Sequence, residues 1–478
     1  MVIISTEMDI VKEVLTAKTP VERCLHVKEN LIKDGVYLHW RVSPEPFRIG
    51  EDELSFIESL GAPLYLFYKA SNKLYYESIH GRQPEWVSRY LDQGKPQAIV
   101  DYARMNRMKG LLPGVIRPDI ILTDDGMVAT ELDSVPGGIG ITGSLGMAYS
   151  TLFGDKVVGD ENGMIHGFTN MLKATVHIPD PVIAIVVSEE SRDYRPEMEW
   201  MAGVIRKNGG RAHTIRPEDI LFTEEGLFFA EGEKRERIDV LYRFYELFDL
   251  KNIPKAELMM YSTKKKAVSV TPPFKPFLEE KLLYALFHHP LLRRYWLEEL
   301  GEEVFSILCK IFPATWILDP ADMPPYGIIP GLKMGERPVA RWRDLAETTQ
   351  SEREFVIKPS GFSELAWGSR GVVVGHDMPR EGWSAAIDKA LLDFDRTPYI
   401  LQEYYRGRHV GADYLDETTG EMKKMTGRAR LCPYYFVEGE GVKLRGIMAT
   451  LCSLEQKLIH GMEDAVITVV AGGCSRRL

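Results

Sequence analysis

Four charged residues interrupt an otherwise apolar segment, "GVIRPDIILTDDGMVATELDSVPGG" at residues 114–138. They are Arg117, Asp119, Glu131 and Asp133. Carboxylates that lie close together repel one another unless a cation or a bound proton relieves the repulsion. Carboxylate oxygens are also hard ligands that suit Mg²⁺ bound together with phosphates. The segment is therefore either a metal and phosphate site or a charged hairpin face in contact with solvent, where charged residues usually lie.

The turn between the two apolar runs decides whether the four side chains share a face. Residues 124–126, Asp-Asp-Gly, fit a three-residue hairpin loop whose last position requires a positive φ. This loop places Asp119 opposite Glu131 and Arg117 opposite Asp133, all on one face. A two-residue loop would shift the pairing by one residue and separate Asp119 from Glu131. We therefore predict the three-residue loop. The opposite face would carry Ile120, Leu122, Val128 and Leu132.

A second segment, "EFVIKPSGFSELAWGSRGVVVG" at residues 354–375, combines a lysine with a glycine-rich loop. Backbone N–H groups in such a loop can surround phosphate oxygens, while Lys358 at the end of the preceding strand supplies a compact positive charge. An ordinary β-turn is the alternative. The strand "YILQEYYRG" follows an intervening helix, so Gln402 and Glu403 stand where an adenine-binding hinge would occur. They could equally form an exposed strand end.

The composition is that of a globular protein. The chain has 478 residues, of which 45% are apolar and 27% are charged, enough for about two to four domains. No apolar run is long enough to span a membrane and the start lacks the pattern of a secretory signal, so we expect a cytoplasmic protein without membrane contact. The five cysteines are scattered without a C-x-x-C pair, which argues against a disulfide framework and a zinc site. A net charge of −10 gives no global attraction to nucleic acid.

Hydrophobic periodicity predicts α/β and α+β structure. "VIAIVVSEE" from residue 182 is typical of a buried strand, a helix follows with Met198, Met201 and Ile205 on one face, and "RAHTI" and a hairpin ending in "IDVLYRFYELFDL" predict further strands. Together they predict a small Rossmann-like unit. "FLEEKLLYALFHHPLLRRYWLEEL" predicts a helix, and residues 354–478 predict mainly strands with one helix.

In their order along the chain these segments resemble the ATP-grasp superfamily, and in particular its circularly permuted branch, which includes glutathionylspermidine synthetase. In most members the lysine and glycine-loop half precedes the metal half, whereas here the acidic hairpin comes first. The resemblance covers roughly residues 100–470 and implies a circularly permuted ATP-grasp fold with a Rossmann-like pre-grasp unit. The matching segments are "RPD", "ELD", "DVLYRFYEL", "EEKLLYALF", "FVIKPSG", "LQEYY" and "RARLCPYYF".

The resemblance divides the chain into four parts. Residues 1–100 would be an N-terminal mixed α/β segment that could bind substrate, and residues 101–180 the metal-binding part of the ATP-grasp. Residues 181–255 would form the Rossmann-like unit, and residues 256–478 the lysine and glycine-loop part.

The resemblance also implies roles for the matched residues. Asp119, Glu131 and Asp133 would hold two Mg²⁺ ions that bridge the ATP phosphates. Arg117 would approach the terminal phosphate, and Arg430, or Arg428 as the alternative, would complete the phosphate clamp. The remaining nucleotide contacts would come from Lys281, Lys358, Ser360, Gly361, Gly368, Ser369, Gly371, Gln402, Glu403 and Tyr404. For Lys281 a solvated position on a helix surface is an equal alternative.

Two positions depart from the family pattern. Asp133 stands where the family usually has Asn, and the loop after Lys358 is longer than usual and contains Trp367. An aspartate is still a good Mg²⁺ ligand, so the first departure is compatible with metal binding.

The activity implied is ADP-forming ligation, in which a small-molecule carboxylate takes the γ-phosphate of ATP and an amine then displaces the acyl phosphate. The cofactors would be ATP and Mg²⁺. An ATP-binding regulatory or scaffold protein that has lost ligase activity is the alternative, and a kinase that stops at phosphorylation is a third hypothesis. No amidase domain is implied, and neither the substrates nor the oligomeric state follow from the sequence.

Overall fold

The structure is a computed structural model that describes residues 18–32, 40–176, 178–321, 327–456, 459 and 464–473. The start of the predicted N-terminal segment lies outside these ranges. Among the helices of the described ranges, none is both long enough and apolar enough to cross a membrane.

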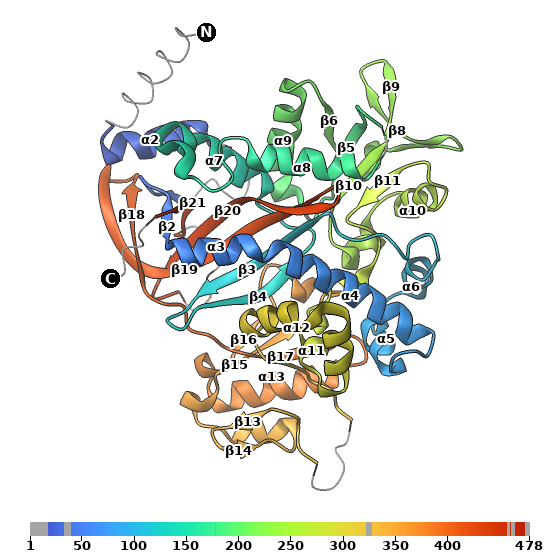
Figure 1. The fold of residues 1–478 in the computed structure, drawn as a ribbon, viewed down its shortest axis with the longest axis vertical. Helices are drawn as coiled ribbons and strands as arrows, with labels where there is room; N and C mark the ends of the chain where they lie inside the picture. Colours follow the sequence, from blue (N-terminus) through green and yellow to red (C-terminus); the bar gives the residue numbers. More distant parts are fainter. Residues whose placement is uncertain are drawn as a thin grey trace.

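An eight-stranded mixed sheet forms the centre of the molecule (Figure 1). Its main path runs β1 (Arg41–Val42), β21 (Val466–Gly472), β20 (Gly441–Ser453), β19 (Glu421–Glu438), β3 (Val115–Leu122), β4 (Met127–Asp133); β18 (Val410–Asp416) pairs with β19 and β2 (Phe47–Ile49) with β21. Helices cover both faces of the sheet, and residues of β19 pack against them on each side. On one face Leu431 and Tyr435 pack with α3 (Glu51–Ser59) and α4 (Gly61–Ile79). On the other face Tyr434 packs with α7 (Ile139–Phe153) and α8 (Gly163–Ala174).

A four-stranded parallel sheet lies beside the central sheet. Its order is β11 (Ser269–Thr271), β10 (Val240–Phe244), β5 (Val182–Val187) and β6 (Arg211–Ile215), and α9 (Arg195–Lys207) connects β5 to β6. A three-stranded meander, β7 (Leu221–Thr223), β8 (Gly226–Glu231) and β9 (Lys234–Arg237), precedes β10. The parallel strands end toward the acidic hairpin, so residues just after β10 can reach it.

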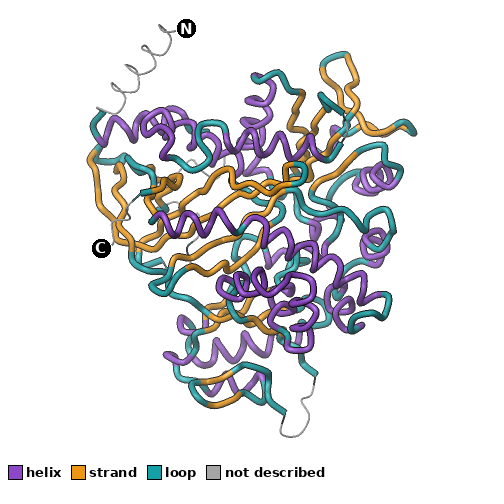
Figure 2. The backbone as a smooth tube through the Cα atoms, viewed as in Figure 1, coloured by secondary structure: helices purple, strands orange, loops and turns teal. Residues whose placement is uncertain are grey.

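A third sheet carries the lysine and glycine-loop segment. It is antiparallel, in the order β12 (Thr315–Ile317), β17 (Tyr399–Glu403), β15 (Phe355–Pro359) and β16 (Val373–Val374), and α13 (Arg380–Leu392) packs against it. In Figure 2 this sheet and its helix form the lower lobe of the molecule. Strands β18 to β21 belong to the central sheet and β11 to the parallel sheet, so residues 256–478 contribute strands to all three of these sheets.

Most of the other described helices surround the sheets. They are α2 (Pro20–Asn30), α5 (Glu85–Asp92), α6 (Gln97–Ala103), α10 (Ala256–Lys264), α11 (Leu282–His288) and α12 (Arg293–Ile311), and a small ribbon is formed by β13 (Lys333–Met334) and β14 (Arg337–Pro338). The helix predicted from "FLEEKLLYALFHHPLLRRYWLEEL" is divided into α11 and α12. The break falls at Pro290, whose backbone nitrogen carries no hydrogen and cannot donate the hydrogen bond that a continuous helix needs.

The acidic hairpin has the predicted pairing but not the predicted turn. Leu122 pairs with Met127 and the Thr123 N–H donates to the Gly126 carbonyl at 2.8 Å, so the loop is formed by the two residues Asp124 and Asp125. The prediction of a three-residue loop is therefore wrong.

A β-bulge restores the pairing that this shorter loop would have lost. The register shifts by one residue between Asp119 and Ile120, so Thr130 of β4 has no residue of β3 paired opposite it. Beyond the bulge Asp119 pairs with Glu131 and Arg117 with Asp133, as predicted. On the turn side of the bulge Ala129, instead of Val128, shares a face with Ile120, Leu122 and Met127, and Val128 is buried on the other face.

The glycine-rich segment after the hairpin forms the N-terminus of α7, and a carboxylate of the protein itself occupies it. Glu197 of α9 accepts hydrogen bonds from the backbone N–H groups of Gly138, Gly140 and Ile141 at 2.8, 3.0 and 3.1 Å. A helix N-terminus favours an anion because its first N–H groups have no partner within the helix. Glu197 thereby joins the parallel sheet unit to the end of the hairpin.

We predict that Glu197→Gln lowers the free energy of unfolding by about 2 kcal/mol, because one of the oxygens that accept these buried N–H groups becomes a donor. Urea unfolding of the variant and the parent measures the loss. The matched control is Glu199→Gln on the same helix, which is exposed and should change stability by less than about 0.5 kcal/mol. Equal midpoints for the two variants would contradict this role of Glu197.

Candidate active site

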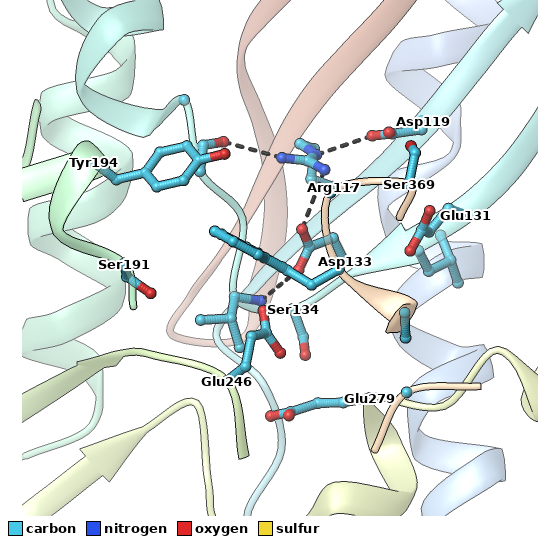
Figure 3. A pocket seen from close by; sticks show the side chains of 18 of the residues that line it. Arg117, Asp119, Glu131, Asp133, Ser134, Ser191, Tyr194, Glu246, Glu279 and Ser369 are labelled. Atoms are coloured by element: carbon cyan, nitrogen blue, oxygen red, sulfur yellow. Dashed lines mark hydrogen bonds and ion pairs between the residues drawn. The ribbon is translucent and has the colours of Figure 1, made fainter. Parts of the chain in front are cut away.

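A cavity of about 260 Å³ lies where the acidic hairpin, the end of β10 and the glycine-rich loop meet (Figure 3). Nine of the residues predicted from the sequence line it: Arg117, Asp119, Glu131, Asp133, Lys281, Gly361, Gly368, Ser369 and Arg430. They come from β3, β4, β19, the start of α11 and the loop after β15. The structure therefore brings together segments more than 300 residues apart in the sequence.

Arg117 lies between two of the acids and binds both. Its Nε donates to Asp119 Oδ1 at 3.0 Å, its Nη2 lies 3.1 Å from Asp133 Oδ2, and its Nη1 donates to the Gly137 carbonyl at 3.0 Å (Figure 3). The Arg117 side chain is only 14% exposed. Because burying an unpaired charge is costly, Arg117 and the two carboxylates depend on one another.

Asp119 is also bound by a second arginine. Arg430 Nη1 lies 3.0 Å from Asp119 Oδ2, and the Cys432 thiol donates to Asp119 Oδ1 at 3.5 Å. Burial raises the pKa of Asp119, but the charges of Arg117 and Arg430 outweigh it and hold the pKa below its usual value. Arg428, the sequence alternative to Arg430, instead donates to the backbone carbonyls of Leu454 and Gln456.

The pKa of Asp133 is shifted in the opposite direction, upward. Burial raises its pKa above the usual value, the charge of Arg117 only partly offsets this, and the neighbouring charges of Glu131 and Asp119 raise it further. One Asp133 oxygen also accepts the Val135 N–H at 2.8 Å.

Glu131 pairs with a lysine from a different element. Lys281 Nζ lies 2.5 Å from Glu131 Oε1 and donates to the Ala366 carbonyl of the glycine-rich loop at 3.2 Å. Burial lowers the pKa of Lys281, but the charge of Glu131 more than compensates and the pKa is raised. Lys281 is thus an inward-facing residue at the start of α11, and the alternative of a solvated surface lysine is wrong.

Lys358 lies beside the cavity rather than in its lining. Its Nζ donates to the Thr130 carbonyl at 3.1 Å and to Gln402 Oε1 at 2.7 Å. Thr130 is the bulge residue of β4, so the lysine from the third sheet binds the carbonyl that the bulge exposes. Burial lowers the pKa of Lys358 to about 8.

The glycine-rich loop is held at its base by a buried acid. Glu280 accepts a hydrogen bond from the Ser360 hydroxyl and one from the Gly361 N–H at 3.0 Å, and it pairs with the buried Lys95. A Cβ on Gly361 would lie 2.0 Å from the Glu279 carbonyl oxygen, so only glycine fits this close approach.

The tip of the loop closes over the cavity. Gly368 and Ser369 have φ values of +62° and +60°, and both line the cavity beside Trp367. Trp367 meets Tyr194 edge-on at 6.2 Å between ring centroids. Arg370 pairs with Glu190 at 3.2 Å across the gap to the parallel sheet unit. Trp367 and Arg370 therefore join the loop to that unit, while Gly371 packs against Pro359 outside the cavity lining.

The residues predicted for adenine and ribose do not line the cavity. Gln402 is buried and binds Lys358 and the Thr315 hydroxyl, at 2.7 and 3.2 Å. Glu403 accepts a hydrogen bond from the Tyr405 hydroxyl at 2.9 Å, and Tyr404 packs against His376 at 4.5 Å between ring centroids.

Several polar residues of the cavity were not predicted, among them Ser191, Tyr194, Glu246 and Glu279. Glu246 and Glu279 lie at one end of the cavity and Ser191 and Tyr194 on the side away from Glu131 (Figure 3). Burial raises the pKa of Glu279 to about 7, with the charge of its partner Arg243 opposing the shift, and burial and Glu279 raise the pKa of Glu246 well above its usual value. Both acids lie inside or beside segments that carried the family resemblance, "DVLYRFYEL" and "EEKLLYALF", but nothing in their spacing distinguished them from surface acids.

In this arrangement each predicted metal ligand is neutralised by a basic side chain. The described residues contain no group of three or more His, Cys, Asp or Glu side chains positioned to hold a metal ion. The predicted acids do face one cavity and offer the hard oxygen donors that Mg²⁺ prefers.

Comparison with solved structures identifies a similar fold. A glutathione synthetase-like effector from Globodera pallida, in its apo form, aligns over 96% of this chain and 98% of its own length, with a TM-score of 0.59 and 12% sequence identity. The chain shares the fold of a glutathione synthetase-like protein. A putative gamma-glutamylcysteine synthetase from Methylobacillus flagellatus KT aligns over 74% of this chain and 79% of its own length at 11% identity, but its TM-score of 0.38 is too low to carry an argument. No family model and no curated protein matches the sequence.

The lowered pKa of Lys358 predicts a pH dependence of stability. Between about pH 8 and the usual lysine value of 10.5, the unfolded chain binds a proton at Lys358 that the folded chain has lost, so this residue makes stability rise with pH. Lys358→Met should remove a slope of at most about 1.4 kcal/mol per pH unit in this interval. Chemical unfolding at pH 8, 9 and 10 measures it, and parallel profiles for variant and parent would contradict the buried, pKa-shifted lysine.

Proposed function

We propose that this protein is an ATP-dependent, ADP-forming carboxylate–amine ligase with a circularly permuted ATP-grasp fold. The observation that carries the proposal is the alternation of acids and bases around one cavity: Asp119, Glu131 and Asp133 with Arg117, Arg430 and Lys281. Basic side chains bind phosphate groups and carboxylates bind metal ions, so a site that holds both requires this mixture of charges. The fold shared with a glutathione synthetase-like protein supports the same class of reaction.

The basic residues would bind the phosphates of ATP. Lys281 and Arg430 each hold an acid that faces the cavity, and an incoming phosphate oxygen offers either of them an alternative partner. Lys358 would add a charge from the third sheet, and the loop backbone at Ser369, which lines the cavity, would supply an N–H group near the phosphates.

The acids would then be free to hold Mg²⁺. Asp119, Glu131 and Asp133 would provide the carboxylate oxygens, and the ions would neutralise charge on the transferring phosphoryl group. Arg117 would stay fixed between Asp119 and Asp133 and keep their spacing, because it also binds the Gly137 carbonyl.

The reaction would proceed in two balanced steps. A substrate carboxylate oxygen forms a bond to the γ-phosphorus as the bond to ADP breaks, and the amine nitrogen then bonds to the acyl carbon as phosphate leaves and the amine loses a proton. An acyl phosphate is hydrolysed if water reaches it, and the loop that carries Trp367 and Ser369 over the cavity would exclude water.

The proposal predicts that Glu131→Gln abolishes most Mg²⁺-dependent ADP formation while preserving the fold, because the substitution keeps the shape of the side chain but removes the charge that offsets the metal. The assay is ADP release over a panel of carboxylate and amine pairs with ATP, with and without Mg²⁺, and with melting temperature as the folding control. The matched control is Asp125→Asn, an exposed acid at the tip of the same hairpin, which should retain full turnover.

Other outcomes separate the alternative functions. A stable phosphorylated product without any amine would indicate a kinase. ATP binding without turnover across the whole panel would indicate a regulatory or scaffold protein. Unchanged Mg²⁺-dependent ADP formation in Glu131→Gln would remove the acidic hairpin from the chemistry.

A further inference from the structure

A second cavity, which we call the aromatic pocket, lies at the edge of the third sheet. Its volume is about 390 Å³, compared with about 260 Å³ for the candidate active site, and the two cavities share no lining residue. Its aromatic walls come from α5, β12 and the segments that follow α11 and β14. They are Trp86, Tyr90, His289, Trp316 and Trp342. A concave site of a few hundred Å³ with aromatic walls and few polar groups is the usual form of a small-molecule site.

Hydrogen bonds and ring contacts fix these walls. The indole N–H of Trp316 donates to the Pro330 carbonyl at 2.8 Å, and that of Trp342 donates to the Asp319 carbonyl at 2.8 Å. Trp86 packs against His289 with 4.6 Å between ring centroids. Because the walls are already ordered, a ligand that stacks on them loses little free energy in arranging them.

One carboxylate faces the pocket from within this aromatic frame. Asp319 accepts hydrogen bonds from the Tyr90 hydroxyl and, at 2.8 Å, from the Ala321 N–H. These two bonds orient the carboxylate but use only one acceptor position on each oxygen, so each oxygen can accept another hydrogen bond. Asp319 can therefore receive N–H donors from a ligand.

The charges around the pocket favour a neutral ligand over a cation. Arg89 also lines it and would oppose a second positive charge, and burial lowers the pKa of both His288 and His289, which keeps these rings neutral at pH 7. Flat aromatic walls favour a flat ligand, which can stack on them.

We propose that the aromatic pocket binds a neutral, planar nitrogen heterocycle, of which a purine base is the probe, with the ring stacked on the tryptophans and its edge N–H groups donating to Asp319. This site lies outside the candidate active site and does not rest on the ligase proposal.

Calorimetric titration of the full-length protein with adenosine and guanosine tests the proposal. Neither nucleoside carries a phosphate, so neither can use the basic residues of the active site. We expect saturable binding that Asp319→Asn weakens at least tenfold, because the amide keeps an oxygen for the Tyr90 hydroxyl but loses the charge and one acceptor. Trp86→Ala should weaken binding to a similar extent by removing one wall. Unchanged melting temperatures would show that both variants are folded.

Two comparisons make the result specific. Trp367→Ala removes an aromatic side chain that lines the active-site cavity and should leave nucleoside affinity within twofold of the parent, so loss of binding in this variant would place the nucleoside in the active site and overturn the proposal. Tetramethylammonium tests the alternative of a cation held by aromatic rings. The proposal would also be overturned if tetramethylammonium bound in preference to both nucleosides or if neither nucleoside bound. Equal nucleoside affinity in Asp319→Asn and the parent would overturn it as well.

Discussion

The candidate site depends on one buried guanidinium. Arg117 contacts Asp119, Asp133 and the Gly137 carbonyl, and each contact fixes a different element: β3 itself, the end of β4 and the approach to α7. A buried ion is tolerated only when it is paired and hydrogen-bonded, so none of these partners can move away without a large cost. Glu197 links this charge cluster to the parallel sheet unit, because it lies on α9 and accepts hydrogen bonds from backbone N–H groups at the start of α7.

The bulge at Thr130 couples this charge cluster to the third sheet. It brings Glu131 and Asp133 opposite Asp119 and Arg117, and it presents the carbonyl that Lys358 binds at 3.1 Å. Bulges are frequent beside functional sites because they redirect side chains without ending the strand. Here the one extra residue determines which face of the hairpin carries Glu131 and Asp133, and it also forms the contact with the third sheet.

The sequence was sufficient to predict the pairing of the four hairpin residues and most of the strands. Of the loop residues predicted, Gly361, Gly368 and Ser369 line the cavity, whereas Ser360 and Gly371 do not. The sequence predicted the wrong turn, since Asp-Asp-Gly fits a three-residue loop locally and no local pattern reveals the compensating bulge, whose carbonyl binds Lys358 from more than 200 residues away. Glu246 and Glu279 were not found, because an isolated acid carries no local signal and only the end of β10 and the start of α11 bring these two together. Gln402 and Glu403 lie on a strand, as predicted, and this strand pairs with the strand of Lys358, but Gln402 is buried against the lysine instead of facing the cavity.

The central claim is that the acids and bases of the cavity exchange partners when a nucleotide binds. A crystal structure with a non-hydrolysable ATP analogue and Mn²⁺, located by its anomalous signal, tests this claim most directly. We predict Mn²⁺ at Asp119, Glu131 and Asp133, Lys281 turned from Glu131 to a phosphate oxygen, and Arg117 still between Asp119 and Asp133. A nucleotide bound elsewhere, with the Lys281–Glu131 pair intact and no metal at the hairpin, would contradict it.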